Sequence, residues 1–272
     1  MKITTIRTGK IVPGMQTLEN VLDSNIPPLK EGSVVAVTSK IISICEGRVV
    51  PVESAGGSGK TGGSDKTNKA DKMNKTDKAE LVKREADFIL YPKKQRYNII
   101  LTLKRNVLIP TAGIDESNGN GYYVLWPADP QKSANEIRAY LRKRFHIKDI
   151  GVIVTDSHTS PFRRGTTGVA IAYSGFQALR NYVGKPDIFG RTMKVTKANV
   201  ADALAVAAVL VMGEGSEQTP LAIIEEVPFV GFQRRNPSAG ELRGLYISIE
   251  SDLYGPLLTS VKWHKGGGRA IK

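Results

Sequence analysis

Two apolar runs in this sequence each end in an aspartate that is followed by small polar residues. VLIPTAGIDESN carries Asp115, and GVIVTDSH carries Asp156. A carboxylate at the end of a strand is held on a rigid support, and hard cations such as Mg²⁺ and Mn²⁺ prefer oxygen ligands of this kind. Together the two aspartates could hold a metal ion that bridges triphosphate oxygens. The alternative for each is a structural role, in which the side chain caps the following turn.

The residues after Asp156 could complete an anion site. They are Ser157, His158, Thr159, Ser160, Phe162, Arg163 and Arg164. A hydroxyl can complete a metal shell or bind phosphate, and a guanidinium group can grip a carboxylate or phosphate with two hydrogen bonds. His158 could act as a general base or donate to an anion. The alternatives are a solvated basic turn and a histidine that makes only structural hydrogen bonds.

A third segment, VTSKIISICEGRVV, places Lys40, Ser43 and Glu46 after a short β-branched run. Lys40 could contact a nucleotide phosphate as a point charge, although a lysine after a strand is also commonly just solvated. Cys45 is the only cysteine of the chain, which excludes an internal disulfide and a thiolate metal cluster. We interpret it as a buried thiol rather than a nucleophile.

The elements that must position these side chains alternate between strand and helix patterns. Runs rich in apolar and β-branched residues predict strands, and apolar residues at spacings of three and four predict helices. The expected strands are 34–38, 98–103, 107–110, 122–126, 150–155, 169–172, 221–224 and 245–249, and the expected helices are about 131–145 and 199–212. The irregular order, without strict strand-helix repetition, predicts an α+β fold with a mixed sheet.

The composition is that of a globular protein with an unusual charge. The 272 residues are 40% hydrophobic and carry a net charge of +13, which raises nucleic-acid binding without catalysis as an alternative function. Phosphate-bearing or polycarboxylate substrates explain the surplus as well, and the chain lacks the interleaved aromatic and basic residues of RNA-binding motifs. With no apolar stretch of signal-peptide or membrane-span length, we expect a cytoplasmic protein that does not enter a membrane.

Two segments are expected to lie outside the folded core. Residues 54–78 hold six Lys and three Asp among Gly, Ser, Thr and Asn, so we expect a disordered inserted loop. Its GGSGKT sequence is only part of a phosphate-binding loop, because Ser54 stands where the first glycine is required and no strand precedes it. Residues 264–272 are expected to form a flexible tail.

Taken together, the motifs resemble the coenzyme F-420-0:γ-glutamyl ligase family, which includes enzymes that add glutamates to a deazaflavin coenzyme and relatives proposed to act in folate metabolism. The matching segments are SKIISICEGRVV, AGIDESN, GVIVTDS, RRGTTGVAIAYSGF, KPDIFGR and ADALAVAAVLVMGEG, in this order along nearly the whole chain. The resemblance implies one ligase-like unit over residues 1–272 with a fold of its own, built from two intertwined subdomains and distinct from P-loop and ATP-grasp folds.

The resemblance also implies a reaction. A homodimeric ligase would join L-glutamate to a small acidic acceptor through a γ-glutamyl-type amide bond and an acyl phosphate, using GTP or ATP. Its cofactors would be two divalent ions, Mg²⁺ or Mn²⁺, with a monovalent cation as an option. The implied metal ligands are Asp115, Asp156 and Ser157, the implied nucleotide contacts are Lys40, Ser43, Glu46, Ser117 and Asn118, and the candidate catalytic residues are His158, Arg163 and Arg164.

The chain departs from the family pattern beside the second aspartate. Deazaflavin ligases commonly read S-D-T-F-G-R-P-W-R there, whereas this chain reads T-D-S-H-T-S-P-F-R from Thr155 to Arg163. Ser157 thus replaces a metal-binding threonine, and His158, Thr159 and Ser160 replace aromatic and basic positions. The change concerns the acceptor more than the chemistry, so a folate, a pterin and a deazaflavin all stay open as acceptors.

Overall fold

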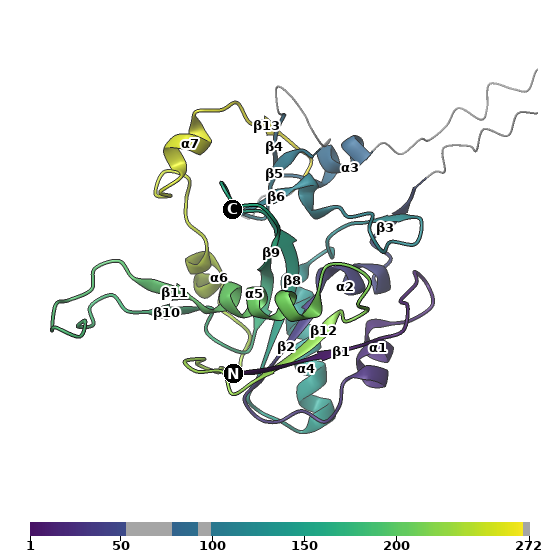
Figure 1. Ribbon diagram of the computed structural model, residues 1–272, viewed down its shortest axis with the longest axis horizontal. Helices are drawn as coiled ribbons and strands as arrows, with labels where there is room; N and C mark the ends of the chain where they lie inside the picture. The colour runs from purple at the N-terminus through teal and green to yellow at the C-terminus, as the bar shows by residue number, and fades with distance from the viewer. Residues whose placement is uncertain (53–77, 92–98, 269–272) are drawn as a thin grey trace, which may run out of the picture.

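The computed structural model describes residues 1–52, 78–91 and 99–268, which build a mixed α+β structure around a five-stranded sheet (Figure 1). From edge to edge the strands are β1 (Lys2–Ile6), β12 (Leu221–Glu225), β2 (Ser33–Thr38), β8 (Ile150–His158) and β9 (Thr167–Ser174). Strands β2 and β8 run parallel, and the other neighbours are antiparallel. The predicted α+β class with a mixed sheet is therefore confirmed.

The central sheet is covered on both faces. One face packs against α1 (Leu18–Asn25), α2 (Ser39–Cys45) and α4 (Pro130–Phe145), and the other against α5 (Val200–Met212) and α6 (Ala239–Leu245). Along β2, Val35 and Val37 point to the first face, while Val34 and Ala36 point to the second. Because side chains alternate between two buried faces, the strand is apolar at successive positions and reads as a continuous apolar run.

The two helices that the sequence predicted begin at clear capping residues. At the start of α4, the Asp129 side chain accepts a hydrogen bond from the backbone N–H of Lys132. At the start of α5, Asn199 accepts from Asp202 in the same way. Such caps satisfy backbone donors that a helix leaves unpaired, and Gly213 then ends α5. Helix α5 can lie close to β9 because Gly168 has no Cβ. A Cβ there would stand only 2.4 Å from the carbonyl oxygen of Ala205.

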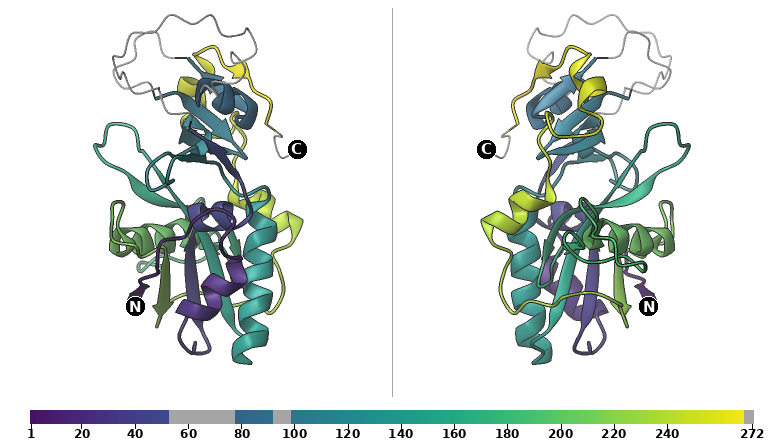
Figure 2. Two further views of the ribbon diagram at one scale, coloured as in Figure 1. Left: turned by 90° about the vertical axis from the view of Figure 1, so that its right-hand side faces the viewer. Right: turned by 90° about the vertical axis from the view of Figure 1, so that its left-hand side faces the viewer.

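A second, four-stranded sheet forms the upper part of the molecule in Figure 2. Its order is β13 (His264–Lys265), β4 (Phe88–Leu90), β5 (Leu101–Lys104) and β6 (Val107–Pro110), and α3 (Lys78–Glu85) packs beside it. The turn between β5 and β6 consists of Arg105 and Asn106, both with positive φ, as a tight two-residue hairpin requires.

The remaining elements are short. Strands β3 (Val49–Pro51) and β7 (Tyr122–Val124) pair with each other and form a separate two-stranded sheet. The short helix η1 (Thr111–Gly113) follows β6. Strands β10 (Leu179–Asn181) and β11 (Lys197–Asn199) open an arm, residues 182–196, that extends away from the body in Figure 1. Helix α7 (Gly255–Thr259) completes the described elements. The intertwining of two subdomains stays a prediction.

The structure differs from the sequence-based expectation at three places. No strand forms over 245–249, because Ser238 and Glu241 form a capping box that starts α6, and this helix runs to Leu245. The expected tail is ordered as far as residue 268, since His264 and Lys265 pair with β4. Lys78 begins α3 rather than ending a loop. The rest of the Lys-rich segment, with its GGSGKT sequence, lies outside the described residues.

In the part of the chain that the structure describes, we find no helix of the length and apolar character that a membrane span needs.

Candidate active site

The parallel pairing of β2 and β8 brings together the predicted segments that carry Lys40 and Asp156. Thr38, the last residue of β2, lies opposite Thr155 of β8, so the residues that follow Thr38 and Thr155 lie near the same carboxyl-terminal edge of the sheet. Lys40 follows in the first turn of α2, and Asp156 is the next residue of β8. Asp115 reaches this edge from the loop after η1, where its backbone bridges to Val124.

Asp115 is the centre of a small polar cluster. Its Oδ2 accepts hydrogen bonds from Lys40 Nζ at 2.6 Å and from Ser117 Oγ at 2.8 Å. Its Oδ1 accepts from the backbone N–H groups of Glu116 and Ser117 at 2.7 and 2.9 Å. Asp115 therefore caps its own turn, as the structural alternative expected, and also pairs with Lys40, while its role as a metal ligand stays a prediction. Burial opposes ionisation, but Lys40 and Ser117 hold the pKa of Asp115 below its usual value.

Asp156 has a different environment. Its Oδ2 accepts the indole N–H of Trp126, and its Oδ1 accepts the backbone N–H of Ser157 at 2.8 Å. It forms no ion pair with the residues that the structure describes. Burial raises the pKa of Asp156 to about 6, against these two hydrogen bonds, and the nearby charge of Asp115 adds to the rise. Asp156 is thus a carboxylate surrounded by neutral donors, with no cation beside it comparable to Lys40 beside Asp115.

The loop after α5 contacts residues next to both aspartates. Ser157 Oγ donates to Glu214 Oε1 at 2.6 Å, and Asn118 Nδ2 donates to the carbonyl oxygen of Gly215 at 2.8 Å. Glu214 was not among the predicted site residues. It follows a long apolar helix, and only the folded structure shows that this helix ends beside Ser157.

Two of the predicted nucleotide contacts do not reach the cluster. Ser43 is fully buried within α2, and its hydroxyl has no partner in the described chain. Glu46 accepts hydrogen bonds from Ser133 Oγ at 2.8 Å and from the backbone N–H of Ala128 at 3.1 Å. Its carboxylate therefore holds the start of α4 against the end of α2.

The three candidate catalytic residues lie at the end of β8 and on the turn that follows it. His158 ends β8, and Arg163 and Arg164 are exposed in the turn, where they follow the fully exposed Phe162 in sequence. Within the described residues, the imidazole and both guanidinium groups make no hydrogen bond or ion pair. These residues follow Asp156 in the chain and are available to a ligand. They do not contact Lys40, Asp115, Ser117 or Asp156, which we call the aspartate cluster.

The donor atoms at the cluster are all oxygens. Asp115, Asp156 and Ser157 supply oxygens of the kind that Mg²⁺ and Mn²⁺ prefer, and Glu214 contacts them only through the Ser157 hydroxyl. Asp156 in particular fits a cation, because it is a half-buried carboxylate without a basic partner. Over residues 1–52, 78–91 and 99–268, no three His, Cys, Asp or Glu side chains are gathered into a ready metal site. The protein alone thus offers carboxylates on two elements rather than a closed cage.

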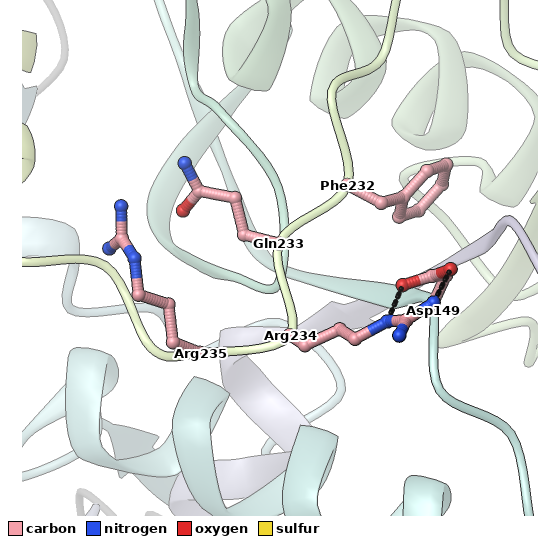
Figure 3. A pocket seen from close by; sticks show the side chains of 5 residues that line it. All are labelled: Asp149, Phe232, Gln233, Arg234 and Arg235. Carbon is pink, nitrogen blue, oxygen red and sulfur yellow. Dashed lines mark hydrogen bonds and ion pairs between the residues drawn. The ribbon is translucent and has the colours of Figure 1, made fainter.

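A shallow pocket lies at the opposite end of β8 (Figure 3). Its lining residues are Asp149, Phe232, Gln233, Arg234 and Arg235. Arg234 binds Asp149 with Nε–Oδ1 and Nη2–Oδ2 distances of 3.0 and 3.2 Å, and Arg235 pairs with Glu241. Both guanidinium groups are already paired with carboxylates, so this pocket lacks the chemistry of the aspartate cluster.

Comparison with known proteins points to one family. A family model described as F420-0:Gamma-glutamyl ligase matches residues 5–226. The chain is 36% identical over 215 residues to the coenzyme F420:L-glutamate ligase of Methanopyrus kandleri, covering 79% of this chain and 82% of that protein. Proteins of the same name from Methanocaldococcus jannaschii and Archaeoglobus fulgidus are 34 and 32% identical, with 74 and 82% of this chain and 79 and 84% of theirs covered.

Proposed function

Because this chain belongs to the F420-0:gamma-glutamyl ligase family, we propose that it is a ligase that joins L-glutamate to a small acidic acceptor through a γ-glutamyl-type amide bond. The observation that supports this most directly is the meeting of Lys40, Asp115 and Asp156 at one edge of the central sheet. A cation and two carboxylates, supplied by separate elements, suit the handling of a phosphorylated substrate.

The proposed reaction consumes one nucleoside triphosphate, GTP or ATP. The acceptor carboxylate attacks the γ-phosphorus, so that a phosphoryl group is transferred to the acceptor and the nucleoside diphosphate leaves. The amine of glutamate then attacks the acyl carbon and an amide bond forms, while the bond from this carbon to the phosphate oxygen breaks, inorganic phosphate leaves and the amine loses a proton to a base. In this scheme Lys40 binds phosphate oxygens as a point charge, and Ser117 and Asn118 shape the loop next to it.

We further propose that Asp115, Asp156 and Ser157 hold Mg²⁺ or Mn²⁺. Such ions, when bound, would neutralise charge on the transferred phosphoryl group. Asp156 supports this assignment because its carboxylate faces only neutral hydrogen-bond donors. Asp115 would bind the cation after Lys40 turns to the nucleotide. The Lys40 ammonium would then keep the local charge balanced.

The acceptor should bind along the turn between β8 and β9. Phe162 presents a fully exposed ring, and the next two residues, Arg163 and Arg164, carry exposed guanidinium groups that are unpaired within the described residues. An aromatic face and two cations suit a flat ring system that carries a carboxylate, as folates, pterins and deazaflavins do. His158, which ends β8 between this turn and Asp156, would be the base that takes up the amine proton of glutamate.

We also propose that the active form is a homodimer. The arm between β10 and β11 extends from the body and carries Ile188, Phe189 and Val195, which are 91, 89 and 84% exposed (Figure 1). Apolar side chains on a projecting arm are stabilised when a second copy covers them. Sedimentation should give a dimer, and Phe189→Asp should shift the equilibrium toward monomers.

Phosphate release from GTP and from ATP tests the reaction. The assay needs Mg²⁺ or Mn²⁺, L-glutamate and, one at a time, a folate, a pterin and a deazaflavin acceptor, with the products analysed by mass spectrometry. A mass increase of one glutamyl residue on an acceptor would establish both the reaction and its substrate. Absence of release with every acceptor, together with tight RNA or DNA binding that weakens steeply with salt, would favour the nucleic-acid alternative.

A further inference from the structure

Trp126 is buried beneath the aspartate cluster and touches it through one polar atom. The side chain is 1% exposed, and its indole N–H donates to Asp156 Oδ2. An indole has a single donor and no acceptor, so this hydrogen bond also fixes how the ring lies. The residue follows β7 and reads in the sequence as an ordinary core aromatic.

The backbone at Gly113 leaves room for the indole ring because glycine has no side chain. A Cβ atom at Gly113 would lie 2.1 Å from Trp126 Nε1 and 2.6 Å from Cε2. Any larger residue would therefore displace the edge of the indole that carries the N–H group. Gly113 also has a φ of +68°, a conformation that favours glycine. This glycine lies two residues before Asp115, so the loop that carries one aspartate makes room for the indole that contacts the other.

An ion cluster of Lys104, Arg48 and Glu85 packs against Trp126. Lys104 Nζ lies 5.3 Å from the centre of the ring system and 3.0 Å from Glu85 Oε2. Arg48 Nη2 binds the same carboxylate oxygen at 2.7 Å, and its Nε donates to the carbonyl oxygen of Trp126 at 3.1 Å. Lys104 contacts the ring of Trp126, Arg48 contacts its backbone, and both cations bind the Glu85 carboxylate. These contacts restrict the motion of Trp126.

We propose that Trp126 is a positioning residue, whose indole N–H holds the Asp156 carboxylate in the orientation that binds the divalent cation. This inference rests on the metal assignment in the proposed function. With Oδ2 bonded to the indole and Oδ1 to Ser157 N–H, each oxygen keeps one lone pair for a cation. Loss of such an outer hydrogen bond typically costs about 10- to 100-fold in metal affinity.

The test compares the two tryptophans of the chain. Trp126→Phe keeps an aromatic ring but removes the donor. Trp263→Phe is the matched control, because its indole N–H donates to the carbonyl oxygen of Leu258 at 2.7 Å, outside the aspartate cluster. Mn²⁺ affinity of the full-length protein, measured without nucleotide from the free-ion signal in electron paramagnetic resonance, should fall about 10- to 100-fold in the first variant and stay unchanged in the second.

Fluorescence provides a second measurement that leaves the site intact. In the Trp263→Phe protein, Trp126 is the only tryptophan, and its emission should change as Mg²⁺ neutralises the carboxylate that its N–H contacts. In Trp126→Phe, the remaining Trp263 should not respond. This readout keeps the inference testable even if removal of the indole lowers the thermal stability of the fold.

The outcomes separate the two proposals. Equal Mn²⁺ affinity in all three proteins, with no change in Trp126 emission, would overturn the positioning role and leave the ligase and its metal in place. No Mn²⁺ binding by the unaltered protein would count against the metal assignment and overturn the inference with it. Weaker binding only in Trp126→Phe, with an emission change assigned to Trp126, would support both.

Discussion

Replacing Glu85 by glutamine should destabilise the fold far more than the same change at Glu80, although both residues lie on α3. The Glu85 side chain is 12% exposed and accepts hydrogen bonds from Lys104 at 3.0 Å and Arg48 at 2.7 Å. Glu80 instead pairs with Lys83 at the surface, where the two side chains are 65 and 48% exposed. The two variants thus make the same chemical change in a buried and in a solvated environment.

The magnitude follows from what each change leaves behind. The Lys104 side chain is 7% exposed, so Glu85→Gln leaves a buried ammonium group without its counter-ion. Breaking a buried ion pair from one side costs about 3 to 5 kcal/mol. An exposed pair contributes about 1 kcal/mol or less. We expect the free energy of unfolding to fall by about 3 to 5 kcal/mol in Glu85→Gln and by less than about 1 kcal/mol in Glu80→Gln.

The effect should also depend on pH. Burial lowers the pKa of Lys104 even against the attraction of Glu85, and the pKa should fall further without that carboxylate, because Arg48 and Arg105 are cationic. A lysine with a lower pKa in the folded than in the unfolded state binds fewer protons when folded, so stability rises with pH between the two values. The penalty of Glu85→Gln should therefore shrink as pH rises from about 7 toward the unfolded-state pKa of about 10.4.

Urea unfolding followed by circular dichroism at neutral and alkaline pH measures both effects. Each variant is compared with the unaltered protein at the same pH, so the general pH dependence of the fold cancels. Equal losses of stability in Glu85→Gln and Glu80→Gln would refute the buried ion cluster. A penalty that grows with pH would refute the assignment of the uncompensated charge to Lys104.

Three further predictions concern the site and its surroundings. Asp115→Asn and Asp156→Asn should each abolish cation-dependent phosphate release from GTP or ATP in folded protein, and full activity in both variants would remove the proposed metal ligands. Lys40→Met should raise the KM for nucleotide about tenfold or more, the equivalent of about 1.4 kcal/mol, in steady-state kinetics, and an unchanged KM would exclude a phosphate contact. Burial raises the pKa of Cys45 to about 11. Iodoacetamide at about pH 8 should therefore alkylate this half-buried thiol roughly two orders of magnitude more slowly than a free thiol, with the rate rising about tenfold per pH unit. Rapid labelling, followed by mass spectrometry, would contradict the raised pKa.

The sequence predicted the central sheet well because burial on both faces leaves a plain signal. The runs that became β2, β8, β9 and β12 are apolar or β-branched at successive positions, and the caps of α4 and α5 stand where the periodicity begins. The order of the strands was not predictable, because pairing depends on contacts between segments far apart in the chain. The meeting of Lys40 with Asp115, 75 residues later, is of this kind.

The expected tail contains three glycines that the structure describes. The backbone of Gly266 to Gly268 packs on the end of α3 and on the two residues that follow this helix. A Cβ at Gly266 would lie 2.0 Å from the carbonyl oxygen of Ala86, and one at Gly268 would lie 2.5 Å from Asp87 Oδ1. These glycines allow two backbones to approach closely, a requirement that a single sequence does not distinguish from freedom to move.

Trp126 and Glu214 were missed for a related reason. Both act through one hydrogen bond to a residue that is distant in sequence, and neither stands in a motif that marks chemistry. An apolar strand followed by tryptophan predicts a core residue, which Trp126 also is. The hydrogen bond from Trp126 to Asp156 depends on β8 lying beside it in the fold. Residues that hold a site residue in place are therefore harder to infer from sequence than the charged residues of the site.

The exposure of the Lys40–Asp115 pair bears on how the site would accept its substrates. The side chains are 27 and 48% exposed, and an ion pair of this kind contributes about 1 kcal/mol or less. A triphosphate presents several negative oxygens and a divalent cation presents two positive charges, so each is a stronger partner than the one it would replace. In the proposed reaction, Lys40 would therefore turn to phosphate and Asp115 to a cation at small cost, whereas the indole of Trp126 would hold Asp156 in place. One ligand that exchanges partners and one that is held in place would let nucleotide and metal enter together.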